Sequence, residues 1–146
     1  MIEAPQETIR LSVERRLAAA PEQVFDAWLD PGAVGRWLFA TPDGAMERVE
    51  VDARVGGRFL IAERRGDVLA GHFGEYVEID RPRRLVFTLA TDREGAPSRV
   101  TVTVEPDGDG SRVTLVHEMD AKWTDYAERT RQGWTMILEG LGQHLA

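Results

Sequence analysis

A change in the spacing of apolar residues constrains the fold of this chain more than any other feature. Between residues 47 and 119, apolar side chains mostly recur at every second position, which is typical of strands with one buried face. After Asp120 the spacing lengthens to about 3.6 residues, and one face of the predicted C-terminal helix carries Trp123, Ala127, Trp134, Ile137, Leu138, Leu141 and Leu145. One helix packed on a curved sheet leaves a hollow where the two surfaces diverge, and such hollows hold small molecules.

The N-terminal part predicts one strand followed by two short helices. Residues 8–17 alternate in hydrophobicity and predict a half-buried strand. Pro21 occupies a favourable first helical position, and an apolar stripe follows it until Asp30 and Pro31 end the helix. Asp30 can cap a second short helix over residues 31–37.

Glycine-, proline- and aspartate-rich turns divide the rest of the chain into strands of an antiparallel sheet. Turns are predicted at residues 41–44, 55–57, 65–67, 94–97 and 107–110. Gly71 and Gly74, within a strand over residues 69–79, permit bending or the close approach of a neighbour. In the final helix, Gly133, Gly140 and Gly142 suggest close packing or a bend at Gly133.

Composition narrows the functional classes. The 146 residues suit a single domain, 1–146, with a sizeable core. A net charge of −7 argues against nucleic acid or an anionic membrane surface as partner. The chain has no cysteine, no apolar run of membrane-spanning length, and a polar opening segment from Met1 to Arg10, so we expect a cytoplasmic protein without a signal peptide.

Several short segments form a recognisable pattern by their order and spacing: residues 20–28, Asp30-Pro31, Arg36-Trp37, residues 56–59, residues 74–79, residues 84–88, residues 114–117 and Gly133-Trp134. Together they span nearly the whole chain and resemble the SRPBCC superfamily (START-like or Bet v 1-like). The branch they resemble is related to the C-terminal domain of the activator of Hsp90 ATPase.

The resemblance implies an α+β helix-grip fold, in which a curved seven-stranded antiparallel sheet surrounds a long C-terminal helix and two short helices follow strand 1. It also implies an apolar cavity. Activities in the superfamily range from lipid or polyketide binding to ring cyclisation and co-chaperone action, so the fold alone does not specify a function. A chaperone partner and a homodimer both stay open.

His117 is the strongest chemical candidate. It shares a strand face with Leu115 and Met119 and should point toward the predicted hollow. An imidazole there could orient a polar ligand atom or transfer a proton. The commoner alternative is a core histidine bonded to a neighbour, and His72 and His144 receive no role.

Other chemistries find no matching pattern. No spacing of His, Asp or Glu is typical of a metal site, so no metal is expected. No serine lies in a nucleophile elbow, and no glycine-rich loop precedes a helix as in phosphate-binding motifs, so no catalytic residue and no cofactor are assigned.

Aromatic residues are the remaining candidates. Trp28, Phe87 and Trp134 are expected mainly to fill the core, whereas Trp37 and Trp123 should lie near openings. The predicted ligand-binding site comprises Trp37, Phe59, Ile61, His117, Trp123 and Trp134.

Three hypotheses follow. The first is binding of a small, largely apolar or aromatic molecule between the sheet and the C-terminal helix. The second is cyclase- or dehydratase-like catalysis on a polyketide-type ring, with His117 and a carboxylate such as Glu63. The third is a chaperone-associated interaction module, which would require a contiguous exposed apolar patch.

Overall fold

The computed structural model describes residues 8–91 and 98–146, and its main layer is a seven-stranded antiparallel sheet. The strand order is β1-β7-β6-β5-β4-β3-β2. The strands are β1 (Thr8–Leu17), β2 (Ala45–Val51), β3 (Arg58–Arg65), β4 (Val68–Asp80), β5 (Arg84–Thr91), β6 (Ser98–Asp107) and β7 (Gly110–Asp120). The turn predicted at residues 94–97 and most of the opening segment from Met1 lie outside the described residues.

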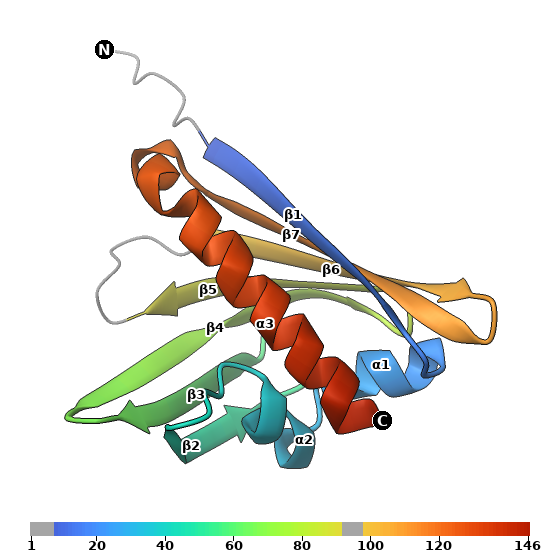
Figure 1. Cartoon of the computed structure of the whole chain (residues 1–146), viewed down its shortest axis with the longest axis horizontal. Coiled ribbons are helices and arrows are strands. Elements are labelled where there is room, and N and C mark those ends of the chain that lie inside the picture. Colours follow the sequence, from blue (N-terminus) through green and yellow to red (C-terminus); the bar gives the residue numbers. More distant parts are fainter. Residues whose placement is uncertain (1–7, 92–97) are drawn as a thin grey trace.

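Helices cover one side of this sheet. Helices α1 (Pro21–Ala27) and α2 (Pro31–Trp37) follow β1, and the 3₁₀ helix η1 (Ala121–Tyr126) leads into the long helix α3 (Ala127–Leu145). Figure 1 shows α3 crossing in front of the sheet, with α1 and α2 near its C-terminal end. The predicted fold, a helix-grip arrangement with two short helices after the first strand, is confirmed.

The core follows from the alternation of the strands. Inward side chains of β6 and β7, among them Val100, Val102 and Leu115, are fully buried. They meet Leu138 and Leu141 from α3 and Val24 and Phe25 from α1 in one apolar cluster. Burial of such side chains contributes roughly 1.5–3 kcal/mol each, so the two-residue period dictates which sheet face the helices cover.

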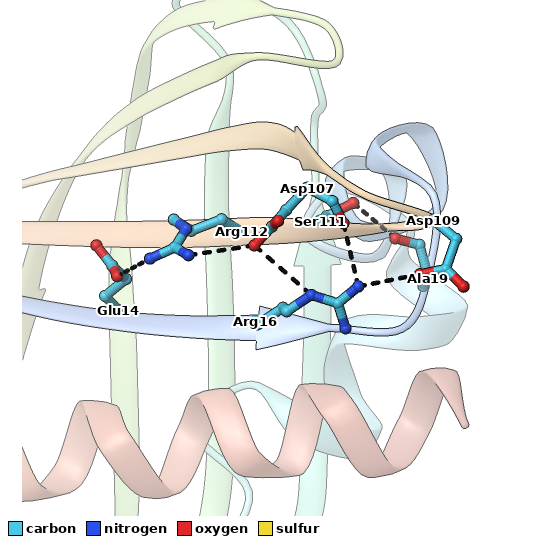
Figure 2. Close-up of polar contacts among 7 residues, drawn as sticks. All are labelled: Glu14, Arg16, Ala19, Asp107, Asp109, Ser111 and Arg112. Atoms are coloured by element: carbon cyan, nitrogen blue, oxygen red, sulfur yellow. Dashed lines mark hydrogen bonds and ion pairs between the residues drawn. The ribbon is translucent and has the colours of Figure 1, made fainter.

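Strand β1 forms one edge of the sheet and pairs with β7. Beside this pairing, Arg16 donates to Asp109 Oδ1 at 3.0 Å and to the carbonyl of Asp107 at 3.1 Å, and Arg112 bridges Glu14 and Asp107. The buried hydroxyl of Ser111 donates to the carbonyl of Ala19 at 2.6 Å. Figure 2 shows this cluster linking the end of β1 to the β6–β7 hairpin.

Two glycine expectations have different outcomes. A Cβ at Gly74 would lie 1.8 Å from the carbonyl oxygen of Thr88, so the backbone of β5 does approach β4 closely there. A Cβ at Gly133 would meet nothing within 4 Å, so close packing is wrong for that position. Gly142 is the tightly packed glycine of α3, because its Cβ would lie 3.1 Å from Leu17 Cδ2.

The start of the last helix also differs from a uniform 3.6-residue pattern. Residues 121–126 form a 3₁₀ helix, and Trp123 has non-helical backbone angles (φ −94°, ψ 15°). The side chain of Asp120 accepts a hydrogen bond from the amide of Lys122 at 2.9 Å and caps this segment. The α-helix itself therefore begins at Ala127, and Trp123 lies on the connecting turn.

Candidate functional site

A cavity of about 910 Å³ lies between the sheet and α3 and is partly open to solvent. This is the upper part of the usual size range of small-molecule sites. Gly133 on α3 lines the cavity, and a Cβ at this position would extend into open space. Its apolar lining comes from α2 and the following loop, β5, β7, η1 and α3, and includes Trp37, Phe39, Leu89, Met119, Trp123, Trp134 and Ile137.

Four of the six predicted site residues line this cavity: Trp37, His117, Trp123 and Trp134. Phe59 and Ile61 point to the same side of the sheet but belong to the packed core. Phe59 lies against Tyr76 and Phe87, with ring centroids 5.5 Å apart in each pair. These two residues are therefore not among those that line the cavity.

His117 is held by hydrogen bonds on both ring nitrogens. The indole Nε1 of Trp134 donates to His117 Nδ1 at 3.0 Å, and His117 Nε2 lies 2.7 Å from Ser98 Oγ. The Ser98 hydroxyl in turn donates to the carbonyl of Leu89 at 3.1 Å. Burial lowers the pKa of His117 to about 4, because a charged imidazole would lose its hydration. The ring is therefore neutral at pH 7.

The loop after α2 supplies a strained aromatic wall. Phe39 has a left-handed backbone conformation (φ 58°), which costs a bulky residue free energy and is often found near functional sites. Its ring stacks on His72 with centroids 4.0 Å apart and an interplanar angle of 2°. It also contacts Trp134 at 5.7 Å. Phe39 thereby joins the loop, β4 and α3 at the cavity.

A buried carboxylate holds the same loop in place. Glu63 on β3 is 2% exposed and accepts hydrogen bonds from the amide of Thr41 at 2.8 Å, the hydroxyl of Thr41 at 2.7 Å and Arg65 Nε at 2.8 Å. Arg65 also donates to the carbonyl of Phe39 at 3.1 Å. Burial raises the pKa of Glu63, but the hydrogen bonds from Arg65 and Thr41 outweigh it and leave the pKa below its usual range.

The mouth of the cavity carries aromatic and charged groups. Trp123 on η1 is partly exposed and packs edge-on against Tyr126, with centroids 5.6 Å apart, and Lys122 Nζ lies 5.5 Å from its ring centroid. Trp37 by contrast is buried and donates its indole N–H to the carbonyl of Ala27 at 3.2 Å. Trp37 therefore offers the cavity ring surface, whereas Trp123 offers a face that meets solvent.

Sequence reasoning left several lining residues out of the predicted site: it gave His72 no role and did not include Phe39, Ser98 or Arg65. Strand parity could have placed Ser98 with Val100 and Val102 on the inward face, and His72 with Tyr76. No sequence signal could have found Phe39, because its position depends on a left-handed residue in a loop. Glu63 was considered as a catalytic partner of His117, but its two oxygens bind Thr41 and Arg65.

Residues 8–91 and 98–146 contain no group of three or more His, Asp or Glu side chains that could hold a metal ion. Within the same residues, no helix combines the length and apolar character needed to cross a membrane.

Comparisons with known proteins agree with the fold. The model of the family described as Activator of Hsp90 ATPase homolog 1-like protein matches residues 18–146. A solved structure from Chromobacterium violaceum is 29% identical with a TM-score of 0.80, covering 94% of this chain and 96% of that chain. An AHSA1-like protein from Aeromonas hydrophila is 25% identical with a TM-score of 0.77, covering 93% of this chain and 91% of that one.

More distant proteins share the fold alone. A protein of unknown function from Staphylococcus aureus is 14% identical and superposes with a TM-score of 0.85, covering 97% of this chain and 95% of that chain. No curated protein matches the chain.

Proposed function

The chain belongs to the Activator of Hsp90 ATPase homolog 1-like family, and we propose that it binds a small, largely apolar or aromatic molecule between the curved sheet and α3. The observation that carries this proposal is the cavity of about 910 Å³ with its lining of aromatic and aliphatic side chains. Burial of apolar ligand surface in such a space supplies roughly 25 cal/mol per Å².

The chemistry of the lining favours binding over catalysis. A general acid or base needs an ionisable group that exchanges protons near the working pH. Both nitrogens of His117 are engaged by Trp134 and Ser98, and burial holds its pKa at about 4. Glu63 is bound by Thr41 and Arg65. The residues considered for cyclase-like chemistry are thus committed to structural hydrogen bonds.

Gly133 offers a direct test of ligand binding. Its missing side chain leaves open space beside the cavity, so Gly133→Leu should place a branched side chain in that space. We expect the variant to lose at least about tenfold in affinity for the hydrophobic fluorophore 8-anilinonaphthalene-1-sulfonate, because it removes volume and apolar contact from the site. Gly133→Ala is the matched control and should bind the fluorophore nearly as well as the wild type.

The measurement is a fluorescence titration of each purified variant, with circular dichroism to show that all three proteins are folded. Equal affinity of the Leu and Ala variants would place the fluorophore outside the cavity. Absence of any saturable binding to the wild type would count directly against the proposed function.

A second candidate function is supported by the outer face of β4. Leu69, Phe73 and Val77 alternate with Gly71 and Glu75 on this face, and their exposed fractions are 40%, 38% and 38%. Leu60 of β3 lies beside Phe73. A row of exposed apolar side chains is typical of a protein-binding surface. The family description names an activator of the Hsp90 ATPase, so an Hsp90 chaperone is the partner to test.

The test compares two apolar-to-polar substitutions at exposed positions. Phe73→Ser should reduce association with an Hsp90 chaperone, measured by calorimetry and by the rate of ATP hydrolysis. Val55→Ser, in the turn between β2 and β3, is the control and should leave both readouts unchanged. If the wild type neither binds the chaperone nor alters its ATPase rate, this second function is excluded.

A further inference from the structure

The polar residues in the cavity form a hydrogen-bond chain whose direction is determined by one donor. The indole Nε1–H of Trp134 can only donate, and it lies 3.0 Å from His117 Nδ1. His117 Nδ1 must therefore present its lone pair and carry no proton. The helix α3, which supplies Trp134, thus selects the tautomer of a histidine on β7.

The remaining protons of the chain follow from this choice. Burial disfavours the charged imidazole, so the single ring proton resides on Nε2. Nε2–H then donates to Ser98 Oγ across 2.7 Å. The Ser98 hydroxyl proton is directed to the carbonyl oxygen of Leu89 at 3.1 Å. Every donor from Trp134 to Ser98 is consequently used within the chain.

The hydrogen-bond chain leaves one acceptor position for a ligand. A hydroxyl group has one donor and two acceptor positions, and Ser98 uses its donor on Leu89 and one acceptor position on His117. Among the described residues, no further donor to Ser98 Oγ is present within hydrogen-bond distance. Ser98 lines the cavity, so its second lone pair is available there.

Resting on the proposed function, we propose that the ligand is an apolar ring compound with a hydroxyl or N–H donor, which Ser98 Oγ accepts. A ligand that presents only a carbonyl or ether oxygen would set its lone pairs against that of Ser98 and leave both unsatisfied. Sites built to pair with a ligand hydroxyl discriminate against analogues without it. The cavity therefore selects for phenol-like over ether-like rings of the same size.

A matched pair of probes tests this preference. We expect 2-naphthol to bind the wild type about tenfold more tightly than 2-methoxynaphthalene, as measured by displacement of 8-anilinonaphthalene-1-sulfonate. Equal affinities, or tighter binding of the ether, would overturn the acceptor assignment and leave apolar ligand binding intact. If neither compound displaces a bound fluorophore, the proposed function fails for ligands of this class.

Substitution of Ser98 should invert the preference. In Ser98→Ala the His117 Nε2–H loses its acceptor and becomes a donor that faces the cavity. The ether should then bind at least as tightly as the naphthol, an inversion that loss of packing alone would not produce. Ser111→Ala is the matched control, because Ser111 is a buried strand serine outside the cavity lining, and it should keep the wild-type preference.

A measurement that needs neither ligand nor variant determines the donor–acceptor order of these hydrogen bonds independently. In the long-range ¹H–¹⁵N spectrum of the histidine rings at pH 7, His117 should show the Nε2–H tautomer. An Nδ1–H tautomer would reverse the hydrogen bonds and overturn the assignment, whatever the binding experiments show. This spectrum also keeps the inference testable if Ser98→Ala does not fold.

Discussion

The imidazole of His117 has both nitrogens engaged, one by the indole of Trp134 and the other by the hydroxyl of Ser98. The residue type alone permits acid–base chemistry, metal binding or packing. Its neighbours select one neutral form and leave no nitrogen free. In the inference drawn above, the polar group that meets a ligand is therefore the hydroxyl of Ser98 and not the imidazole of His117.

This arrangement predicts a pH dependence of stability. The unfolded chain takes up a proton on His117 near pH 6.5, whereas burial lowers the native pKa to about 4. The stabilisation is therefore complete above pH 6.5 and is lost as the pH falls toward 4, by on the order of 3 kcal/mol. Urea unfolding at several pH values should show a shallower decline for His117→Gln, which keeps polar partners but does not titrate. An unchanged slope would contradict the assignment.

Glu63 predicts a second residue-scale effect. Because its hydrogen bonds hold the pKa below the usual range, its stabilisation is present above about pH 4.5 and is lost as the pH falls through the lower native value. At pH 7, Glu63→Gln should cost about 2 kcal/mol, because charged hydrogen bonds to Arg65 and Thr41 are weakened.

Glu47→Gln is the control for Glu63→Gln. Glu47 on β2 forms an exposed ion pair with Arg64 on the neighbouring strand β3, and Arg64 Nε lies 2.8 Å from Glu47 Oε1. Exposed pairs of this kind contribute little to stability. Denaturation at pH 7 should show near-wild-type stability for Glu47→Gln. Equal losses in the two variants would mean that the buried network contributes no more than a surface pair.

At the scale of elements, Gly74 on β4 and Gly133 on α3 differ in how closely neighbouring atoms approach them. The backbone of β5 passes so near Gly74 that a Cβ there would overlap the carbonyl oxygen of Thr88, and the side chain of Thr88 accepts the amide hydrogen of Glu75 at 3.0 Å. On α3, Gly133 instead faces open space beside the cavity. One glycine is needed for strand pairing, and the other leaves room.

The same substitution at both glycines should therefore have opposite effects. Gly74→Ala should destabilise the protein by about 3 kcal/mol, because two strands must separate locally to admit the methyl group. Gly133→Ala should stabilise it by roughly 0.5–1 kcal/mol through helix propensity. Chemical denaturation of the two variants checks the signs. A neutral Gly74→Ala would show that β4 and β5 adjust without cost.

For the whole molecule, the sheet and α3 diverge and leave a volume of about 910 Å³ that the side chains of residues 8–91 and 98–146 do not fill. A ligand that binds this volume binds the native state only and must stabilise it. Lining residues come from both halves of the sheet, from β1 and β7 near one edge to β4 and β3 toward the other, so the volume depends on the whole sheet.

Thermal unfolding should therefore depend on ligand. At a free ligand concentration one hundred times Kd, the stabilisation is about 2.7 kcal/mol, which corresponds to a rise in Tm of roughly 5–10 °C for a domain of this size. Calorimetry with increasing 2-naphthol should show this rise for the wild type and a much smaller one for Gly133→Leu. A Tm that does not respond to saturating ligand would contradict binding in the native cavity.

Much of the fold could be predicted because its signals are local. Alternation over residues 8–17 and 100–119, the cap at Asp30 and the helical spacing from Trp134 to Leu145 each report on neighbours in sequence. The 3₁₀ start at residues 121–126 could not be predicted as easily, since Trp123 continues the helical spacing of apolar residues although its backbone departs from it. Parity also placed His117 on the inward face.

The amino-acid sequence by itself determined the order of the elements and the side of the sheet that each strand residue faces, because periods of two and 3.6 are properties of the local backbone. Only the tertiary structure decided how the helices and the loop after α2 pack against the sheet. Packing of the helices and loops on the sheet buries Phe59 and Ile61 in the core, brings Phe39 onto His72, and sets Trp134 against His117. Such contacts join residues far apart in the chain, so no local pattern encodes them.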